Sequence, residues 1–346
     1  MFQRRIPKVA STVAVVAGCT ALAACGGDER DERTRFEQAL ATLPGEEPVG
    51  SGYGWIDIER MRESGVPLAA ELEWAREALG PGARDLAGPS ADLGSIGLEP
   101  LAADAALAVT SNYPSAIRFD GVEPAGVEGT LEAAGAREGE EAGWRTFDLG
   151  GESAIPLGTA AEPLGSLAAR SATRSGQLVF ARSDLARSNM IGDSDRAIDA
   201  DLVAAGAECI GDPIAARFML NNHTHVPGLG PDLFAFGVSA PDERPAREVF
   251  CAIDDDAARV DAAAEALGGI FEPGARDAVT GEPIRASFVD AVIEDYEGHG
   301  HSGVRANLLD APGTEPGQLF GAFDRGSLVT YVGLPPPPLP DVLRDP

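Results

Sequence analysis

The chain of 346 residues contains a single lysine, Lys8, although arginine is common. Beyond that position no lysine can hold a nucleotide phosphate in a P-loop, form a Schiff base or act in a Ser–Lys dyad. The sequence also lacks the patterns G-x-S-x-G, H-E-x-x-H and C-x-x-C, which are typical of serine hydrolases, zinc peptidases and thiol redox proteins. These absences favour a binding or structural protein over an enzyme.

Positive charge is scarce in the chain as a whole. Lysine and arginine together number 27, against 55 aspartates and glutamates, which gives a formal net charge of −28. The use of arginine in place of lysine, with abundant alanine, glycine and aspartate, is typical of GC-rich genomes such as those of actinobacteria. Because so acidic a chain is repelled by phosphate backbones and anionic lipid headgroups, we expect no nucleic-acid partner.

Cysteine is scarce as well, and the second of the four cysteines stands in a distinctive place. The first eight residues carry three basic groups, residues 9–24 are uncharged and apolar or small, and this segment ends in Leu22, Ala23, Ala24 and Cys25. The segment is too short and too rich in alanine and glycine for a membrane span, which needs about 20 strongly apolar residues. It has the features of a secretory signal peptide.

Residues 22–25 resemble the lipobox of bacterial lipoproteins. The resemblance implies that residues 1–24 are removed and that acyl chains such as palmitate are attached to Cys25. Two or three chains anchor a protein durably, whereas one chain binds a membrane only marginally. We therefore expect a lipoprotein on the extracytoplasmic face of the cell membrane. An ordinary signal peptide ending in cysteine is the alternative, and the Sec and Tat export routes both stay open.

Removal of the signal peptide would leave Cys209 and Cys251 as the only cysteines besides Cys25. Because exported proteins meet an oxidising environment, we predict a disulfide bond between these two; buried free thiols are the alternative. The bond would close a loop of about 43 residues, for which the chain-entropy model gives roughly 4 kcal/mol of stabilisation. The mature chain would carry a formal charge of −31, since residues 1–24 hold three basic and no acidic groups.

The rest of the chain divides into three parts by composition. Residues 25–50 are expected to form a lipidated tether with a short helix, residues 51–333 an α+β extracytoplasmic domain, and residues 334–346 a proline-rich tail. Strand-like apolar stretches alternate with helical ones, of which residues 254–267 are the clearest, with acidic residues at the start and a glycine pair at the end. We predict a mostly antiparallel sheet with helices packed on one face.

The two halves of this domain, residues 51–183 and 205–333, show a similar order of elements. In each half a strand precedes a helix that begins with acidic residues, and further strands follow. This order suggests two divergent β-α-β-β units. The alternative is chance, because alanine-rich helices between strand-like stretches resemble one another without common origin.

The four histidines form two pairs with the same spacing, His223 with His225 and His299 with His301. In extended backbone residues i and i+2 point to the same side, so each pair can offer two imidazoles to one ion. Both pairs together could complete a tetrahedral zinc or copper site. The second pair falls at the tip of a hairpin that we predict from residues 287–294 and 304–309. Exposed loop histidines without a metal are the alternative.

Three functions remain open from these observations. The first is a membrane-anchored binding or structural component of the cell envelope, whose partner is an unknown envelope protein or ligand. The second is a metal-binding lipoprotein that uses the histidine pairs. The third is an envelope hydrolase with paired carboxylates or a bound metal, for which no aspartate or glutamate stands out in so acidic a chain. We predict the first, because the anchor and the expected disulfide suit an exported binding protein.

Overall fold

The computed structural model describes residues 33–44, 52–65, 67–80, 93–110, 116–151, 158–159, 161–162, 169–192, 196–220, 231–239, 245–272, 274–277 and 280–324. All of them belong to one compact unit that begins at Arg33. The lipobox residues Leu22, Ala23, Ala24 and Cys25, the proline-rich tail and the last strand-like stretch of the domain lie outside the described residues. No helix in the described part of the chain is long and apolar enough to span a membrane.

The described residues contain twelve strands, which form one antiparallel sheet. The strands are β1 (Gly52–Asp57), β2 (Ala105–Thr110), β3 (Ala116–Asp120), β4 (Arg137–Glu141), β5 (Trp144–Asp148), β6 (Arg170–Arg174), β7 (Gln177–Ala181), β8 (Ala215–Leu220), β9 (Leu233–Val238), β10 (Arg247–Asp254), β11 (Phe288–Gly298) and β12 (His301–Asp310). The prediction of an α+β fold with a mostly antiparallel sheet is therefore confirmed.

Eight α-helices accompany the sheet in the described residues. They are α1 (Arg35–Leu40), α2 (Ile58–Glu63), α3 (Leu68–Ala75), α4 (Ala125–Ala133), α5 (Asp184–Ile191), α6 (Asp201–Ile210), α7 (Ala257–Ile270) and α8 (Gln318–Asp324). The longest, α7, begins later than the sequence indicates. Asp254 still belongs to β10 and binds Arg259, with 2.6 Å from Oδ2 to Nε, and Asp256 caps the helix by accepting the N–H of Ala258 at 2.9 Å.

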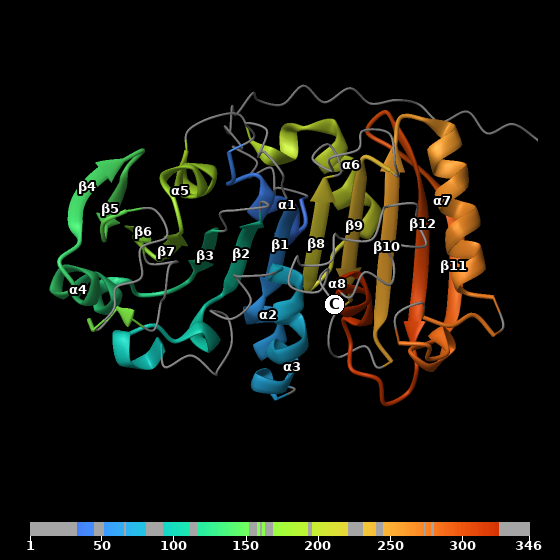
Figure 1. Ribbon diagram of the computed structural model, residues 1–346, viewed down its shortest axis with the longest axis horizontal. Helices are drawn as coiled ribbons and strands as arrows, with labels where there is room; N and C mark the ends of the chain where they lie inside the picture. Colours follow the sequence, from blue (N-terminus) through green and yellow to red (C-terminus); the bar gives the residue numbers. More distant parts are fainter. Residues whose placement is uncertain are drawn as a thin grey trace, which may run out of the picture. The chain divides into compact units, whose positions relative to one another are not determined.

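The strands lie in the order β11-β12-β10-β9-β8-β1-β2-β3-β7-β6-β5-β4 across the sheet (Figure 1). Strands β1 and β8 pair in the interior of the sheet, with Trp55 opposite Ala216. From each of these two strands the chain runs outward through two more strands, continues through a helix, α4 or α7, and returns through further strands. In the first half the last returning strand, β7, pairs with β3. In the second half the last strand, β12, pairs with β10.

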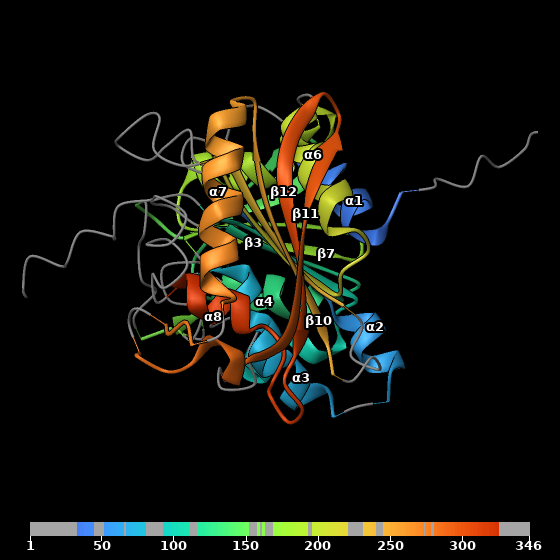
Figure 2. The ribbon, with the colours of Figure 1, turned by 90° about the vertical axis from the view of Figure 1, so that its right-hand side faces the viewer.

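Helices cover both faces of the sheet, so the prediction that they pack on one face is wrong. One apolar core includes Phe250 and Ala252 with residues of α2, α3, α4, α7 and α8, and the other includes Cys251 and Ile253 with residues of α1, α5 and α6. Figure 2 shows α7 on one side of the sheet and α6 on the other. The reason lies in the strands: all six residues of β9 are buried, so both of its faces need apolar cover.

The predicted disulfide between Cys209 and Cys251 is present and joins α6 to β10. Both cysteines are fully buried in the same core. Helix α1, the short helix expected within residues 25–50, packs into this core through Phe36 and Leu40. Its first turn is closed by a reciprocal pair of hydrogen bonds between Thr34 and Glu37, which fixes where the helix begins.

Candidate functional site

The second histidine pair lies at the tip of the predicted hairpin, which β11 and β12 form. His299 and Gly300 make the two-residue turn, with φ values of 51° and 81°. Because His299 is not extended, the rule that places residues i and i+2 on one side does not apply. His299 Nε2 lies 3.5 Å from Glu208 Oε2 of α6, and His301 Nδ1 lies 2.6 Å from Asp255 Oδ1, just before α7. The two imidazoles therefore have carboxylate neighbours from elements that cover opposite faces of the sheet.

The first histidine pair, His223 and His225, lies outside the described residues, between β8 and β9. The flanking strand ends share one end of the sheet with the hairpin tip, because Leu220 pairs with Leu233 and Leu233 with Ile253. Within the described ranges, no three histidine, cysteine, aspartate or glutamate side chains form a group that could hold a metal ion. The site of four histidines stays a prediction.

Residues 298–303 have the spacing G-x-G-x-x-G, which occurs in dinucleotide-binding loops. In those loops the pattern connects a strand to a helix, whose N-terminus holds the pyrophosphate. Here the pattern crosses the turn between two antiparallel strands. It therefore has no such role in this chain.

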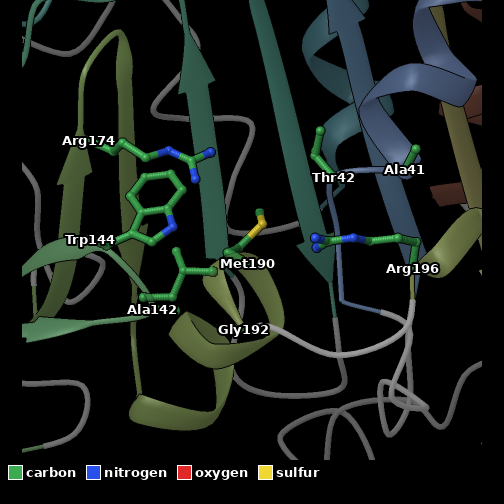
Figure 3. Close-up of a pocket in the computed structure, with 9 residues that line it drawn as sticks. Ala41, Thr42, Ala142, Trp144, Arg174, Met190, Gly192 and Arg196 are labelled. Carbon is green, nitrogen blue, oxygen red and sulfur yellow. The ribbon is translucent and has the colours of Figure 1, made fainter. Parts of the chain in front are cut away.

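A pocket of about 230 Å³ lies on the other half of the sheet, where the C-terminal end of α5 approaches the end of α1 (Figure 3). Its walls also include the β4–β5 turn, the start of β5, the end of β6 and the segment before α6. The apolar part of the wall includes Trp144 of β5 and Met190 of α5, which are 2% and 1% exposed, together with Ile191. The pocket thus brings together residues from separate segments of the chain.

The β4–β5 turn contributes a strained residue to the pocket. Ala142 has a φ of 49°, in the left-handed region, and the next residue, Gly143, has a φ of 76°. Two positive φ values suit the tight hairpin, but the first costs an alanine about 1 kcal/mol because its Cβ crowds the following carbonyl. Strained backbone of this kind is concentrated at functional sites.

Arg174, the last residue of β6, covers the indole ring of Trp144. The guanidinium carbon lies 4.2 Å from the ring centroid, a favourable cation–π distance, and Nε donates to Gln177 Oε1 at 2.9 Å. Burial lowers the pKa of Arg174, and the charges of Arg118 and Arg196 lower it further, whereas Asp120 raises it. Because Arg118 is itself paired with Asp120 at 2.9 Å, Arg196 is the cationic neighbour of Arg174 that bears on the pocket.

Arg196 lies on the opposite side of the pocket. Figure 3 shows Arg174 and Arg196 extending toward each other across the space beside Trp144 and Met190. The segment that carries Arg196 is fastened to the end of α1, because Arg196 forms a β-bridge with Pro44. The two guanidinium groups are thus supplied by β6 and by the segment that leads into α6.

A network of arginines and carboxylates holds α5 against the strands that form the pocket. Arg187 of α5 lies 2.7 Å from Asp148 of β5, and Arg170 of β6 lies 2.8 Å from Asp184 of α5. Burial raises the pKa of Asp148, but hydrogen bonds from Arg137 and Arg187 outweigh it, so that this pKa lies below its usual value. The network positions the end of α5 that lines the pocket.

No protein-family model matches the chain, and comparisons with curated proteins and with solved structures also give no match. The function must therefore be inferred from the site.

The sequence did not reveal this pocket. Trp144, Arg174 and Arg196 belong to no motif, and their spacing along the chain has no period. Tryptophan is rare, with three in the chain, and this was the one signal that could have drawn attention to Trp144. The contact of β6 with β5 and the bridge from Pro44 to Arg196 bring these residues together, and both are tertiary features.

Proposed function

We propose that this chain is a lipid-anchored binding protein on the extracytoplasmic face of the cell membrane, and that the pocket beside Trp144 holds its ligand. The composition of the pocket is the observation that carries the proposal: an indole ring, a thioether and two guanidinium groups. Among the described residues that line it, none brings a carboxylate, imidazole or thiol, and the hydroxyl of Thr42 donates to the carbonyl of Ala39 at 2.6 Å. The pocket is therefore equipped for recognition.

Trp144 makes ligand binding directly measurable. The mature lipoprotein, purified in detergent, is titrated with a library of small organic molecules while its tryptophan emission and thermal midpoint are followed. We expect some compounds to change both, and we expect Trp144→Phe to abolish the change in emission, with the other two tryptophans as a constant background. If no compound changes either signal, or if Trp144→Phe responds as the wild type does, ligand binding in this pocket is excluded.

The anchor is the second part of the proposal. It is supported by the basic residues and apolar segment that precede Cys25, by the lipobox resemblance and by a disulfide of the kind found in exported proteins. The full chain, expressed in a bacterium and fed alkyne-tagged palmitate, should carry the tag in the membrane fraction. Cys25→Ala should lose the tag and keep its signal peptide, whereas Cys209→Ala with Cys251→Ala should retain the tag. Tagging that survives in Cys25→Ala would disprove the anchor.

Metal binding is a second candidate function. Two observations support it: each imidazole at the hairpin tip lies beside a carboxylate oxygen, and the strand ends that flank the first histidine pair lie at the same end of the sheet. Elemental mass spectrometry of the untagged protein should find about one zinc or copper ion per chain, lost when His299→Ala and His301→Ala are combined. Unchanged metal content in that variant, or no metal after challenge with excess zinc and copper, would rule it out.

We also infer that the two halves of the sheet are divergent copies of one β-α-β-β unit. The inference is supported by the equivalent places of β1–β3 and β8–β10 on either side of the β1–β8 pair, and by α4 and α7 covering the same face. Superposition of the two three-stranded segments should bring α4 onto α7. A superposition that leaves these helices apart would contradict a common origin.

A further inference from the structure

We propose that the pocket beside Trp144 selects a small organic anion, a single-ring molecule that carries one carboxylate or phosphate group. This inference rests on the proposed binding function and adds the class of ligand. In this arrangement the acidic group lies between Arg174 and Arg196, and the ring lies against the guanidinium of Arg174, which itself covers the indole of Trp144. Each of these assignments follows from a separate property of the pocket.

The volume of the pocket limits the size of the ligand. An apolar cavity of about 150 Å³ is large enough to bind benzene, and liquid water occupies about 30 Å³ per molecule. The pocket of about 230 Å³ therefore has room for one six-membered ring with a small acidic group.

The charges around the pocket determine the sign of the ligand. Arg118 is paired with Asp120 at 2.9 Å, whereas the guanidinium groups of Arg174 and Arg196 both line the pocket, so these two set the charge at its walls. The chain as a whole is strongly acidic, with a formal net charge of −28. At physiological ionic strength that repulsion is screened over about 8 Å, so the nearest charges dominate inside the pocket. A ligand anion would relieve the mutual repulsion of the arginines.

The placement of the two arginines favours an acidic group with several oxygens. Guanidinium groups present paired N–H donors that match the two oxygens of a carboxylate or the three of a phosphate. Figure 3 shows these groups on opposite sides of the pocket. Nε and Nη2 of Arg174 donate to Gln177 Oε1, so an acid between the two arginines would take its donors from Nη1 of Arg174 and from Arg196. The guanidinium of Arg174 lies over the buried indole of Trp144, and a planar guanidinium can stack on a second aromatic ring with its other face.

A matched pair of ligands separates charge from shape. Phenylacetate and phenylacetamide have almost the same shape, but only the first is charged, and phenyl phosphate tests the second acid class. Binding is measured by isothermal titration calorimetry and by the emission of Trp144 on the mature lipoprotein in detergent. Hydrogen bonds to a charged group favour the acid by about ten- to a hundredfold over the amide. We expect phenylacetate or phenyl phosphate to bind at least tenfold more tightly than phenylacetamide.

Variants test whether the arginines cause this preference. Arg174→Met with Arg196→Met should bind acid and amide equally, whereas Arg247→Met should keep the preference, since Arg247 is exposed on β10, in the other half of the sheet and outside the pocket lining. If the methionine variant does not fold, as judged by its thermal midpoint, Arg174→Lys with Arg196→Lys replaces it and should lose most of the preference through the loss of paired donors.

The outcomes distinguish this inference from the function on which it rests. Equal binding of acid and amide by the wild type, or a preference that survives in the arginine variants, overturns anion selection and leaves ligand binding standing. The same conclusion follows if only neutral compounds of the library change the emission of Trp144. If no compound of either kind binds, both the anion selection and the binding function are wrong.

Discussion

Replacing Glu248 with glutamine should change how the stability of the fold depends on pH. Glu248 lies fully buried in β10, and its two oxygens accept the N–H groups of Gln318 and Leu319 at 2.8 and 2.9 Å, where α8 begins. Burial raises the pKa of its carboxyl to about 7, although these hydrogen bonds and one with Asp310 act against the increase. The folded protein thus keeps a proton that an unfolded chain, with an ordinary pKa of 4.5, releases.

The sign and size of the effect follow from this difference in pKa. Because the folded state binds the extra proton between pH 4.5 and 7, raising the pH through this window lowers the stability of the wild type by up to about 1.4 kcal/mol per pH unit. Above the folded pKa the loss stays constant at about 3 kcal/mol. Glutamine does not titrate, so the free energy of unfolding of Glu248→Gln should rise relative to the wild type by about this amount.

Urea denaturation, followed by circular dichroism at intervals of half a pH unit between 4.5 and 8, measures this difference. Near pH 4.5 the variant should be the less stable protein by about 1 to 3 kcal/mol, since a single amide oxygen replaces two acceptors of backbone N–H groups. Glu140→Gln, on the exposed edge strand β4, serves as the control and should follow the wild type. Parallel profiles for Glu248→Gln and the wild type would refute the reasoning and would mean that the start of α8 keeps the carboxyl ionised despite its burial.

Three further predictions concern stability. Cys209→Ala with Cys251→Ala should lower the free energy of unfolding by about 4 kcal/mol, and the wild type reduced with dithiothreitol should match it; a loss below about 1 kcal/mol would contradict the loop-closure argument. Ala142→Gly should raise stability by about 1 kcal/mol, because glycine removes the left-handed strain of the turn. The control Ala262→Gly, exposed within α7, should lower stability by a similar amount. A lower thermal midpoint for Ala142→Gly than for the wild type would show that the turn is not strained. Asp148→Asn should destabilise the protein by about 2 kcal/mol at pH 7, since it leaves buried arginines without their carboxylate. The difference in stability between variant and wild type should shrink as the pH falls through the lowered pKa of Asp148, and a constant difference down to pH 2 would exclude the ion pair as the cause.

Local patterns in the sequence predicted many elements of the fold. Residues 215–220 and the hairpin of β11 and β12 have the alternation or the apolar run of strands, and they form β8 and that hairpin in the structure. Strand β6 shows the limit of this reasoning. Its sequence, Arg-Ser-Ala-Thr-Arg, is polar, yet its first four residues are buried. Ion pairs with α5 allow Arg170 to be buried, and a partner so distant leaves no local pattern.

The sequence by itself determined what depends on residue type and count: the acidic charge, the exclusion of lysine chemistry, the expectation of an anchor at Cys25, and the pairing of two remaining cysteines. Tertiary structure alone decided that helices cover both faces, that Glu248 is buried beneath α8, and that Arg174 and Arg196 face each other across the pocket beside Trp144. The physical reason is one of range. Composition and periodicity act within a few residues along the chain, whereas a pocket and its electrostatic field depend on which distant segments pack together.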